Sequence, residues 1–191
     1  MSSFDGESNF RNVVNSLDRE NRGDYKGLNV VLPRNEPAMD NTSRMDELRQ
    51  LVYLNPQMIQ ECEETIYALL IASFYFELNT SLSPMPGNRM RCLGTIRCRL
   101  PGGVMVRLVE RIHPSRLSFA THSKALGYYF GERNLSCRRY RKSVEFTVRD
   151  LDQLTSIYAT SAKRPRRKTS AFLQTMQWFI DRQHLDAPSK S

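Results

Sequence analysis

Residues 91–112 read RCLGTIRCRLPGGVMVRLVERI, and this stretch carries the strongest indication of the fold. Two apolar-rich segments flank the Pro-Gly-Gly tripeptide at 101–103, a combination that is typical of a turn between strands. We therefore expect an antiparallel hairpin. A three-residue loop would pair Leu100 with Val104, and this register would gather the apolar side chains on one face of the hairpin.

The other face of the expected hairpin would be basic. Arg97 and Arg107 would lie directly opposite each other, and like charges in that position are destabilising unless something offsets them. A bound polyanion would offset them, and so would acidic side chains of the preceding helices; the sequence does not choose between the two. The arginines expected on this surface are Arg91, Arg97, Arg99, Arg107 and Arg111.

Charge is segregated along the chain. The first 83 residues hold seven Lys and Arg against thirteen Asp and Glu, whereas residues 84–191 hold twenty-one against seven, which gives net charges of −6 and +14 and a total of +8. A solvated surface normally mixes its signs, so this division favours a basic half that binds an anionic partner. The alternative is that the basic half docks on the acidic half of the same chain.

Helix signals dominate the region before the hairpin. Ser43 and Asp46 have the spacing of a capping box, and Asn55-Pro56 ends that first helix and begins a second one. The second helix carries a wide apolar face that continues to Phe74, which makes it the expected core element.

Further elements are expected after the hairpin. Alternation over 136–148 predicts a strand, and Asp150 with Gln153 predicts a short helix to about Tyr158. Residues 115–131 fit neither a helix nor a strand pattern.

The expected fold is α+β, with the N-terminal helices packed against a small antiparallel sheet, a disordered N-terminal arm and a C-terminal amphipathic helix. Its parts are a flexible arm (1–42), a compact domain (43–159) with an acidic helical part (43–83) and a basic sheet part (89–159), a basic linker (160–169) and a last helix (170–184).

A dense basic run lies in the expected linker. Its cations are Lys163, Arg164, Arg166, Arg167 and Lys168. An exposed, extended run of this kind suits a nuclear import receptor or a phosphate backbone, and the alternative is a plain solvated loop. Thr169 and Ser170 follow it in a context that suits a basophilic kinase, and either would cap the last helix. A phosphate there is expected to strengthen the cap and to neutralise part of the basic run.

A second basic cluster interleaves an aromatic residue with cations. It consists of Arg138, Arg139, Tyr140, Arg141 and Lys142. Tyr140 could stack on an unpaired base while its neighbours meet phosphates, or it could pack its ring at the edge of the sheet. In a strand, Arg139 and Arg141 would face away from Tyr140, so only part of the cluster could serve one surface.

Other classes of function lack support in the sequence. The polar and acidic N-terminus predicts no secretion, so the four cysteines are expected to be free thiols. Spacings of the Cys and His residues match no zinc site, and no phosphate loop or nucleophile elbow is present. We expect a protein that is not an enzyme and that needs no metal and no cofactor.

These observations predict a non-enzymatic basic protein that binds nucleic acid, RNA or DNA, through backbone phosphates, in the cytoplasm and in a nuclear phase. Its partners would include an import receptor and a second copy of the chain. The alternative is a matrix-like viral structural protein that binds an anionic membrane surface and nucleoprotein and self-associates. A third hypothesis is a protein that binds a partner through its terminal aromatic helix.

Overall fold

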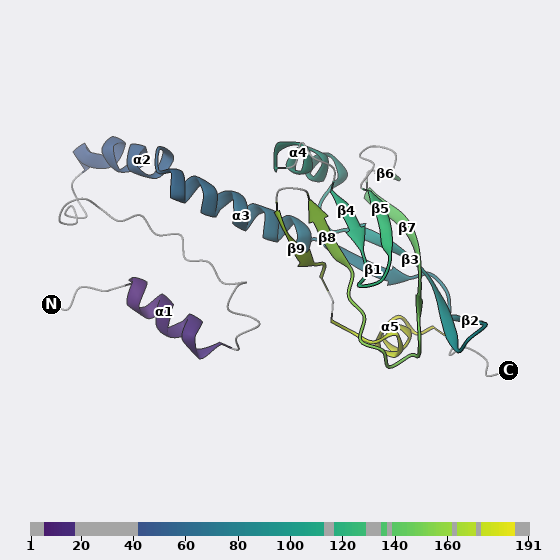
Figure 1. Cartoon of the computed structure of the whole chain (residues 1–191). Helices are drawn as coiled ribbons and strands as arrows, with labels where there is room; N and C mark the ends of the chain where they lie inside the picture. The colour runs from purple at the N-terminus through teal and green to yellow at the C-terminus, as the bar shows by residue number, and fades with distance from the viewer. Residues whose placement is uncertain are drawn as a thin grey trace. The chain divides into compact units, whose positions relative to one another are not determined.

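The protein divides into two units, residues 1–68 and 69–191, and its helices and antiparallel sheets confirm the α+β class (Figure 1). The computed structural model describes residues 6–17, 42–112, 117–128, 135–136, 139–161, 164–170 and 173–185. Within the expected arm, Gly6–Ser16 forms helix α1, which the sequence analysis did not predict. Residues 1–5 and 18–41 of that arm lie outside the described residues. None of the described helices combines the length and the hydropathy needed to cross a bilayer.

The first unit continues with the 3-10 turn η2 (Thr42–Arg44), α2 (Met45–Tyr53) and α3 (Pro56–Ala72). Asn55 caps α3 as predicted, because its side-chain oxygen accepts from the N–H groups of Gln57 and Met58 at 3.0 and 3.1 Å. The capping box at Ser43 is wrong. The N-cap of α2 is Arg44, which instead bonds to the carboxylate of Glu47.

The second unit begins as α3 ends. Both the N–H and the hydroxyl of Ser73 donate to the carbonyl of Leu69, and the chain turns there into a strand at Phe74. The predicted helix through Phe74 is therefore two residues too long. The elements that follow are β1 (Phe74–Leu78), β2 (Ser83–Met85), β3 (Arg89–Cys98), α4 (Gly102–Ile112), β4 (Ser118–Ala120), β5 (Ala125–Tyr128), β6 (Leu135–Ser136), β7 (Arg139–Val148), β8 (Tyr158–Ser161), β9 (Arg164–Lys168) and α5 (Met176–Gln183).

Two antiparallel sheets make up this unit. The first has the order β1-β3-β7-β6, with β2 paired to β3, and the second has the order β5-β4-β8-β9. Their inner faces meet in an aromatic core, where the ring of Phe74 packs at 5.2 Å from Phe119 of the second sheet and at 5.4 Å from Tyr140. Helices α4 and α5 lie at opposite ends of the sheets (Figure 1), and Phe179 of α5 packs on Phe76 of β1.

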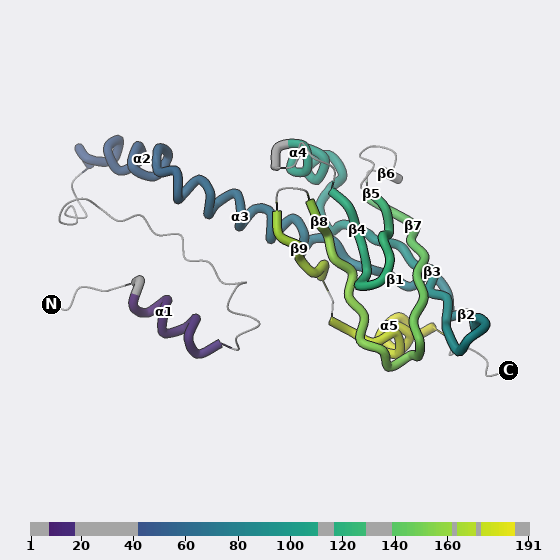
Figure 2. Tube along the Cα trace, viewed as in Figure 1, coloured from purple at the N-terminus to yellow at the C-terminus, as the bar shows by residue number. Residues whose placement is uncertain are grey.

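The hairpin predicted for 91–112 is wrong. Strand β3 ends at Cys98, and residues 102–112 form α4, whose first turn closes when the carbonyl of Pro101 accepts from Val104 and Met105, both at 3.0 Å. The tube in Figure 2 follows the chain from β3 through α4 into β4. The apolar residues of this segment are so frequent that their spacing fits the period of a strand as well as the period of a helix. Burial of Met105 and Val109, four residues apart, decides for the helix.

The strand expected at 136–148 is confirmed as β7, with Tyr140, Val144, Phe146 and Val148 on its buried side. The helix expected after Asp150 is wrong. Gln153 does cap a backbone N–H, that of Arg149 at 2.7 Å, but it closes a turn that leads into β8. The ambiguous segment 115–131 supplies β4 and β5.

The basic linker and the start of the last helix also differ from the prediction. Residues 164–168 form β9, which pairs antiparallel with β8, so this part of the run is an edge strand. Helix α5 begins only at Met176, and its cap is Thr175, whose hydroxyl accepts from Trp178 at 3.1 Å. Neither Thr169 nor Ser170 caps a helix.

Candidate polyanion-binding site

A cavity of about 470 Å³ opens at the end of the first sheet where β1 and β7 begin and β3 ends. We call it the arginine pocket. Its lining residues are Tyr75, Arg97, Cys98, Arg99, Leu100, Pro101, Arg139, Tyr140 and Arg141. None of these described lining residues is acidic, and four of them are arginines. The volume lies within the range of sites that hold small ligands or parts of larger ones.

Strand register brings the pocket together. Arg97 of β3 lies opposite Tyr75 of β1 on one side and opposite Arg141 of β7 on the other. Residues directly opposite each other in an antiparallel sheet project from the same face, so these three side chains form a row across three strands. The face is the one that turns away from the aromatic core.

Two of the arginines are held in place by the protein. Arg97 forms an ion pair with Glu77 of β1, and its side chain is 31% exposed. Arg99 donates from Nη1 to the hydroxyl of Ser170 at 3.0 Å, and its guanidinium lies 5.3 Å from the centre of the Tyr75 ring. These contacts order the two side chains before any ligand binds.

The other two arginines face solvent. Arg139 and Arg141 are exposed, and neither side chain forms a hydrogen bond or an ion pair in the part of the chain that the structure describes. Helix α4 begins directly after Pro101, so the positive end of its dipole lies beside the same cavity. Guanidinium groups bind phosphate oxygens in a bidentate manner, and a cavity lined in this way therefore suits a phosphate-bearing polyanion.

The remaining arginines of the expected hairpin surface lie elsewhere. Arg91 forms an ion pair with Glu145 at 2.8 Å, and the hydrogen bond from Arg91 lowers the pKa of that carboxyl. Arg107 lies on α4, exposed, and does not face Arg97. Arg111 is also on α4, but its side chain lies outside the described residues. Of the predicted arginine face, Arg91 and Arg97 do project from the same side of β3, but only Arg97 and Arg99 line the pocket.

The second basic cluster divides as strand alternation predicts. Arg139 and Arg141 face the solvent, whereas Tyr140 is fully buried and packs against Phe74 and Phe119. Tyr140 is therefore a core residue, and its ring is not accessible for stacking on a base. Lys142 lies on the same inner side, where burial lowers its pKa. Arg138 lies outside the described residues.

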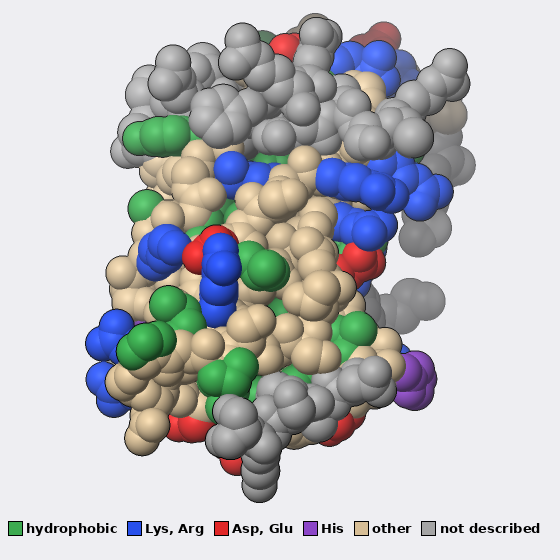
Figure 3. All heavy atoms as spheres, turned by 90° about the vertical axis from the view of Figure 1, so that its right-hand side faces the viewer, with side chains coloured by type: hydrophobic (Ala, Val, Ile, Leu, Met, Phe, Trp, Pro, Cys, Tyr) green, Lys and Arg blue, Asp and Glu red, His purple; other side chains and the backbone are tan. Residues whose placement is uncertain are grey.

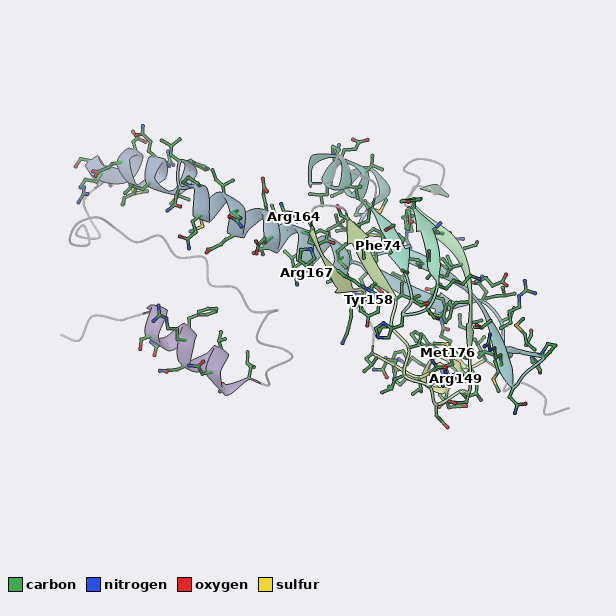
Figure 4. All side chains as sticks on the ribbon, in the orientation of Figure 1. Phe74, Arg149, Tyr158, Arg164, Arg167 and Met176 are labelled. Atoms are coloured by element: carbon green, nitrogen blue, oxygen red, sulfur yellow. The ribbon has the colours of Figure 1, made fainter. Side chains whose placement is uncertain are left out.

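Strand β9 displays part of the basic run. Arg166 stacks its guanidinium 3.7 Å over the ring of Tyr158 and donates to the carbonyl of Thr121 at 2.9 Å. Figure 4 shows Arg164 and Arg167 on β9, with Arg167 nearer to Tyr158 of β8 and Arg164 farther along the strand, where it pairs with Ser161. Lys168 is exposed, and Lys163 lies outside the described residues. An import signal on this run stays a prediction.

The two kinase candidates differ in accessibility. Thr169 is 3% exposed, and its N–H and hydroxyl both donate to the carbonyl of Ile157, at 2.9 and 3.1 Å. Ser170 is half-buried; its N–H donates to Phe74 and its hydroxyl accepts from Arg99. Ser170 therefore lies beside the arginine pocket, whereas Thr169 belongs to the packed interior.

Sequence reasoning missed Tyr75 and Pro101 as parts of the pocket. Tyr75 carried no signal, because its segment has the pattern of the end of a helix, and Pro101 has the pattern of a hairpin turn.

Basic side chains extend beyond the pocket, and Figure 3 shows blue Lys and Arg side chains clustered in the upper right part of one face. Among the described residues, no three His, Cys, Asp or Glu side chains gather as a metal site.

Comparison with protein-family models, with curated proteins and with solved structures found no match for this chain.

Proposed function

We propose that this protein binds nucleic acid through its backbone phosphates, and that the arginine pocket is the centre of the binding surface. The observation that carries the proposal is the convergence of Arg97, Arg99, Arg139 and Arg141 on one cavity without an acidic lining residue among those described. Two of them are ordered by Glu77 and Ser170, and two project into solvent.

The chemistry of the pocket supports backbone binding over base recognition. Side chains that identify bases are usually an ordered set of mixed donors and acceptors, whereas arginines facing solvent contact phosphates and release counterions. The aromatic residue expected to stack on a base, Tyr140, is buried. Binding should therefore depend weakly on sequence and strongly on ionic strength.

The test is equilibrium binding of fluorescein-labelled single-stranded RNA, single-stranded DNA and duplex DNA, followed by fluorescence anisotropy. The double variant Arg139→Gln, Arg141→Gln removes two solvent-facing arginines from the pocket. The matched control is Arg149→Gln, Arg182→Gln, which removes the same charge from two exposed positions outside it.

We expect the pocket variant to lose roughly tenfold in affinity and the control to lose much less, because a general charge effect acts on both alike. Equal losses in the two variants would contradict a specific site. Pelleting with anionic liposomes, without binding to any of the three nucleic acids, would instead favour the matrix-like alternative.

A further inference from the structure

Helices α2 and α3 carry an apolar stripe with the spacing of a coiled-coil seam. Its members lie alternately three and four residues apart when Asn55 fills the position between the two helices. They are Met45, Leu48, Val52, Ile59, Cys62, Ile66 and Leu69. Such a stripe faces one side of a helix over its whole length and is the pattern by which helices pair.

Five of the seven seam residues are exposed and Leu48 and Cys62 are half-buried, although α3 also has a buried face. Tyr67 and Ile71 are 1% and 0% exposed, whereas Ile66 and Leu69 are 40% and 65% exposed. Met45, Val52 and Ile59 are exposed as well, each by more than two fifths of its surface. A contiguous apolar stripe of this kind marks an interaction surface, because leaving it in water costs free energy that pairing recovers.

We propose that the seam of α2 and α3 pairs with the same seam of a second copy of this chain, in antiparallel orientation. The seam is self-complementary about residue 57: Met45 meets Leu69 of the second copy, and Val52 meets Cys62 of the second copy. At 1.5 Å per residue the seam spans roughly 12 Å of α2 and roughly 20 Å of α3, and the two non-helical residues Leu54 and Asn55 separate the two parts.

Charge complementarity selects the orientation. In the heptad, Arg49 and Glu63 both flank the seam, and an antiparallel pair brings Arg49 of one copy next to Glu63 of the other. A parallel pair would instead place Arg49 next to Arg44 of the second copy. Within one chain Arg49 makes a long contact of 3.8 Å with Asp46, and both side chains are largely exposed.

The experiment is sedimentation velocity on the full chain after nuclease treatment and in high salt, so that bound nucleic acid cannot bridge two copies. We expect a concentration-dependent dimer. Ile66→Asn, Leu69→Asn should weaken dimerisation by at least about tenfold. The control Tyr53→Asn, Leu54→Asn alters two residues that are each 73% exposed but lie off the seam, and it should dimerise like the parent.

Orientation is tested with Cys62. In an antiparallel pair, Val52→Cys should form an oxidised covalent dimer through Cys62 of the second copy, and this dimer should disappear in Val52→Cys, Cys62→Ser. Covalent dimers of the parent in which Cys62 of one copy is joined to Cys62 of the other would overturn the antiparallel orientation. A monomer at every concentration, or a seam variant that dimerises like its control, would overturn the proposal itself and leaves the nucleic-acid proposal untouched.

Discussion

Arg97 of β3 and Arg141 of β7 lie directly opposite each other in the antiparallel register of the first sheet. Like charges at such a position destabilise a sheet, and here Glu77 offsets only part of the repulsion through its ion pair with Arg97. The pair therefore opposes stability and favours an anionic ligand.

Replacing one member of this pair should separate stability from binding. We expect Arg141→Gln to raise the free energy of unfolding by about 0.5 kcal/mol at low salt, because the repulsion is removed, while polyanion binding weakens. Urea denaturation and anisotropy measure the two effects. Arg182→Gln, an exposed position on helix α5 and outside both sheets, serves as the control. A less stable Arg141→Gln would mean that Arg141 makes a favourable contact in the folded protein.

Salt dependence should report the number of phosphates bound. For single strands the slope of log affinity against log salt changes by about 0.7 for each phosphate contact, so Arg139→Gln, Arg141→Gln should reduce its magnitude by up to about 1.4. Titrations at several salt concentrations give the slope. An unchanged slope would show that neither arginine contacts a phosphate.

Gly94 of β3 lies where no side chain fits. A Cβ there would overlap the ring of Phe76 and would lie 2.7 Å from the backbone oxygen of Glu77, which cannot move without disturbing β1. Gly94→Ala should therefore cost about 3 kcal/mol or more of unfolding free energy. Gly103→Ala is the matched control, because a Cβ there meets no described atom within 4 Å, and its effect should stay within about 1 kcal/mol. Thermal and urea unfolding measure both.

The two kinase candidates should respond differently to a negative charge. Thr169→Glu buries a carboxylate and removes the bond to the Ile157 carbonyl, so it should lower stability by at least about 2 kcal/mol. Ser170→Glu should keep the melting temperature, because its carboxylate lies beside Arg99, and should weaken polyanion binding. A phosphate at either residue cannot strengthen the start of a helix as predicted, because Thr175 and not Thr169 or Ser170 caps α5. Equal melting temperatures for the two variants would contradict this assignment.

Burial sets the chemistry of two thiols. It raises the pKa of Cys92 to about 12 and that of Cys98 to about 11 from an ordinary value of 9.0. A raised pKa in the folded state adds stability that is complete below pH 9 and is lost as the pH rises from 9 towards 11 to 12. Iodoacetamide at pH 8, added to protein dilute enough to be monomeric, should therefore label half-buried Cys62 and spare Cys92 and Cys98, with peptide mapping as the measurement. Labelling of Cys92 in the folded protein would contradict its burial.

The sequence by itself determined several local features. The α+β class, the Asn55 cap and the strand predicted at 136–148, which forms over Arg139–Val148, follow from residue types at fixed short spacings. Alternation along β7 also separated Arg139 and Arg141 from Tyr140, because the strand period of two depends only on the backbone. The segregation of charge identified the basic half in which the arginine pocket lies.

Only the tertiary structure decided what pairs with what. Residues 102–112 suit a strand and a helix equally, and the helix forms because Met105 and Val109 become buried while β3 finds its partners in β1 and β7. Arg97 therefore faces Arg141, 44 positions along the chain, instead of Arg107. No local pattern carries such a pairing, since the energy of a sheet comes from contacts between segments that are distant in sequence. The same dependence placed the basic run at 164–168 on an edge strand and Tyr140 in the aromatic core.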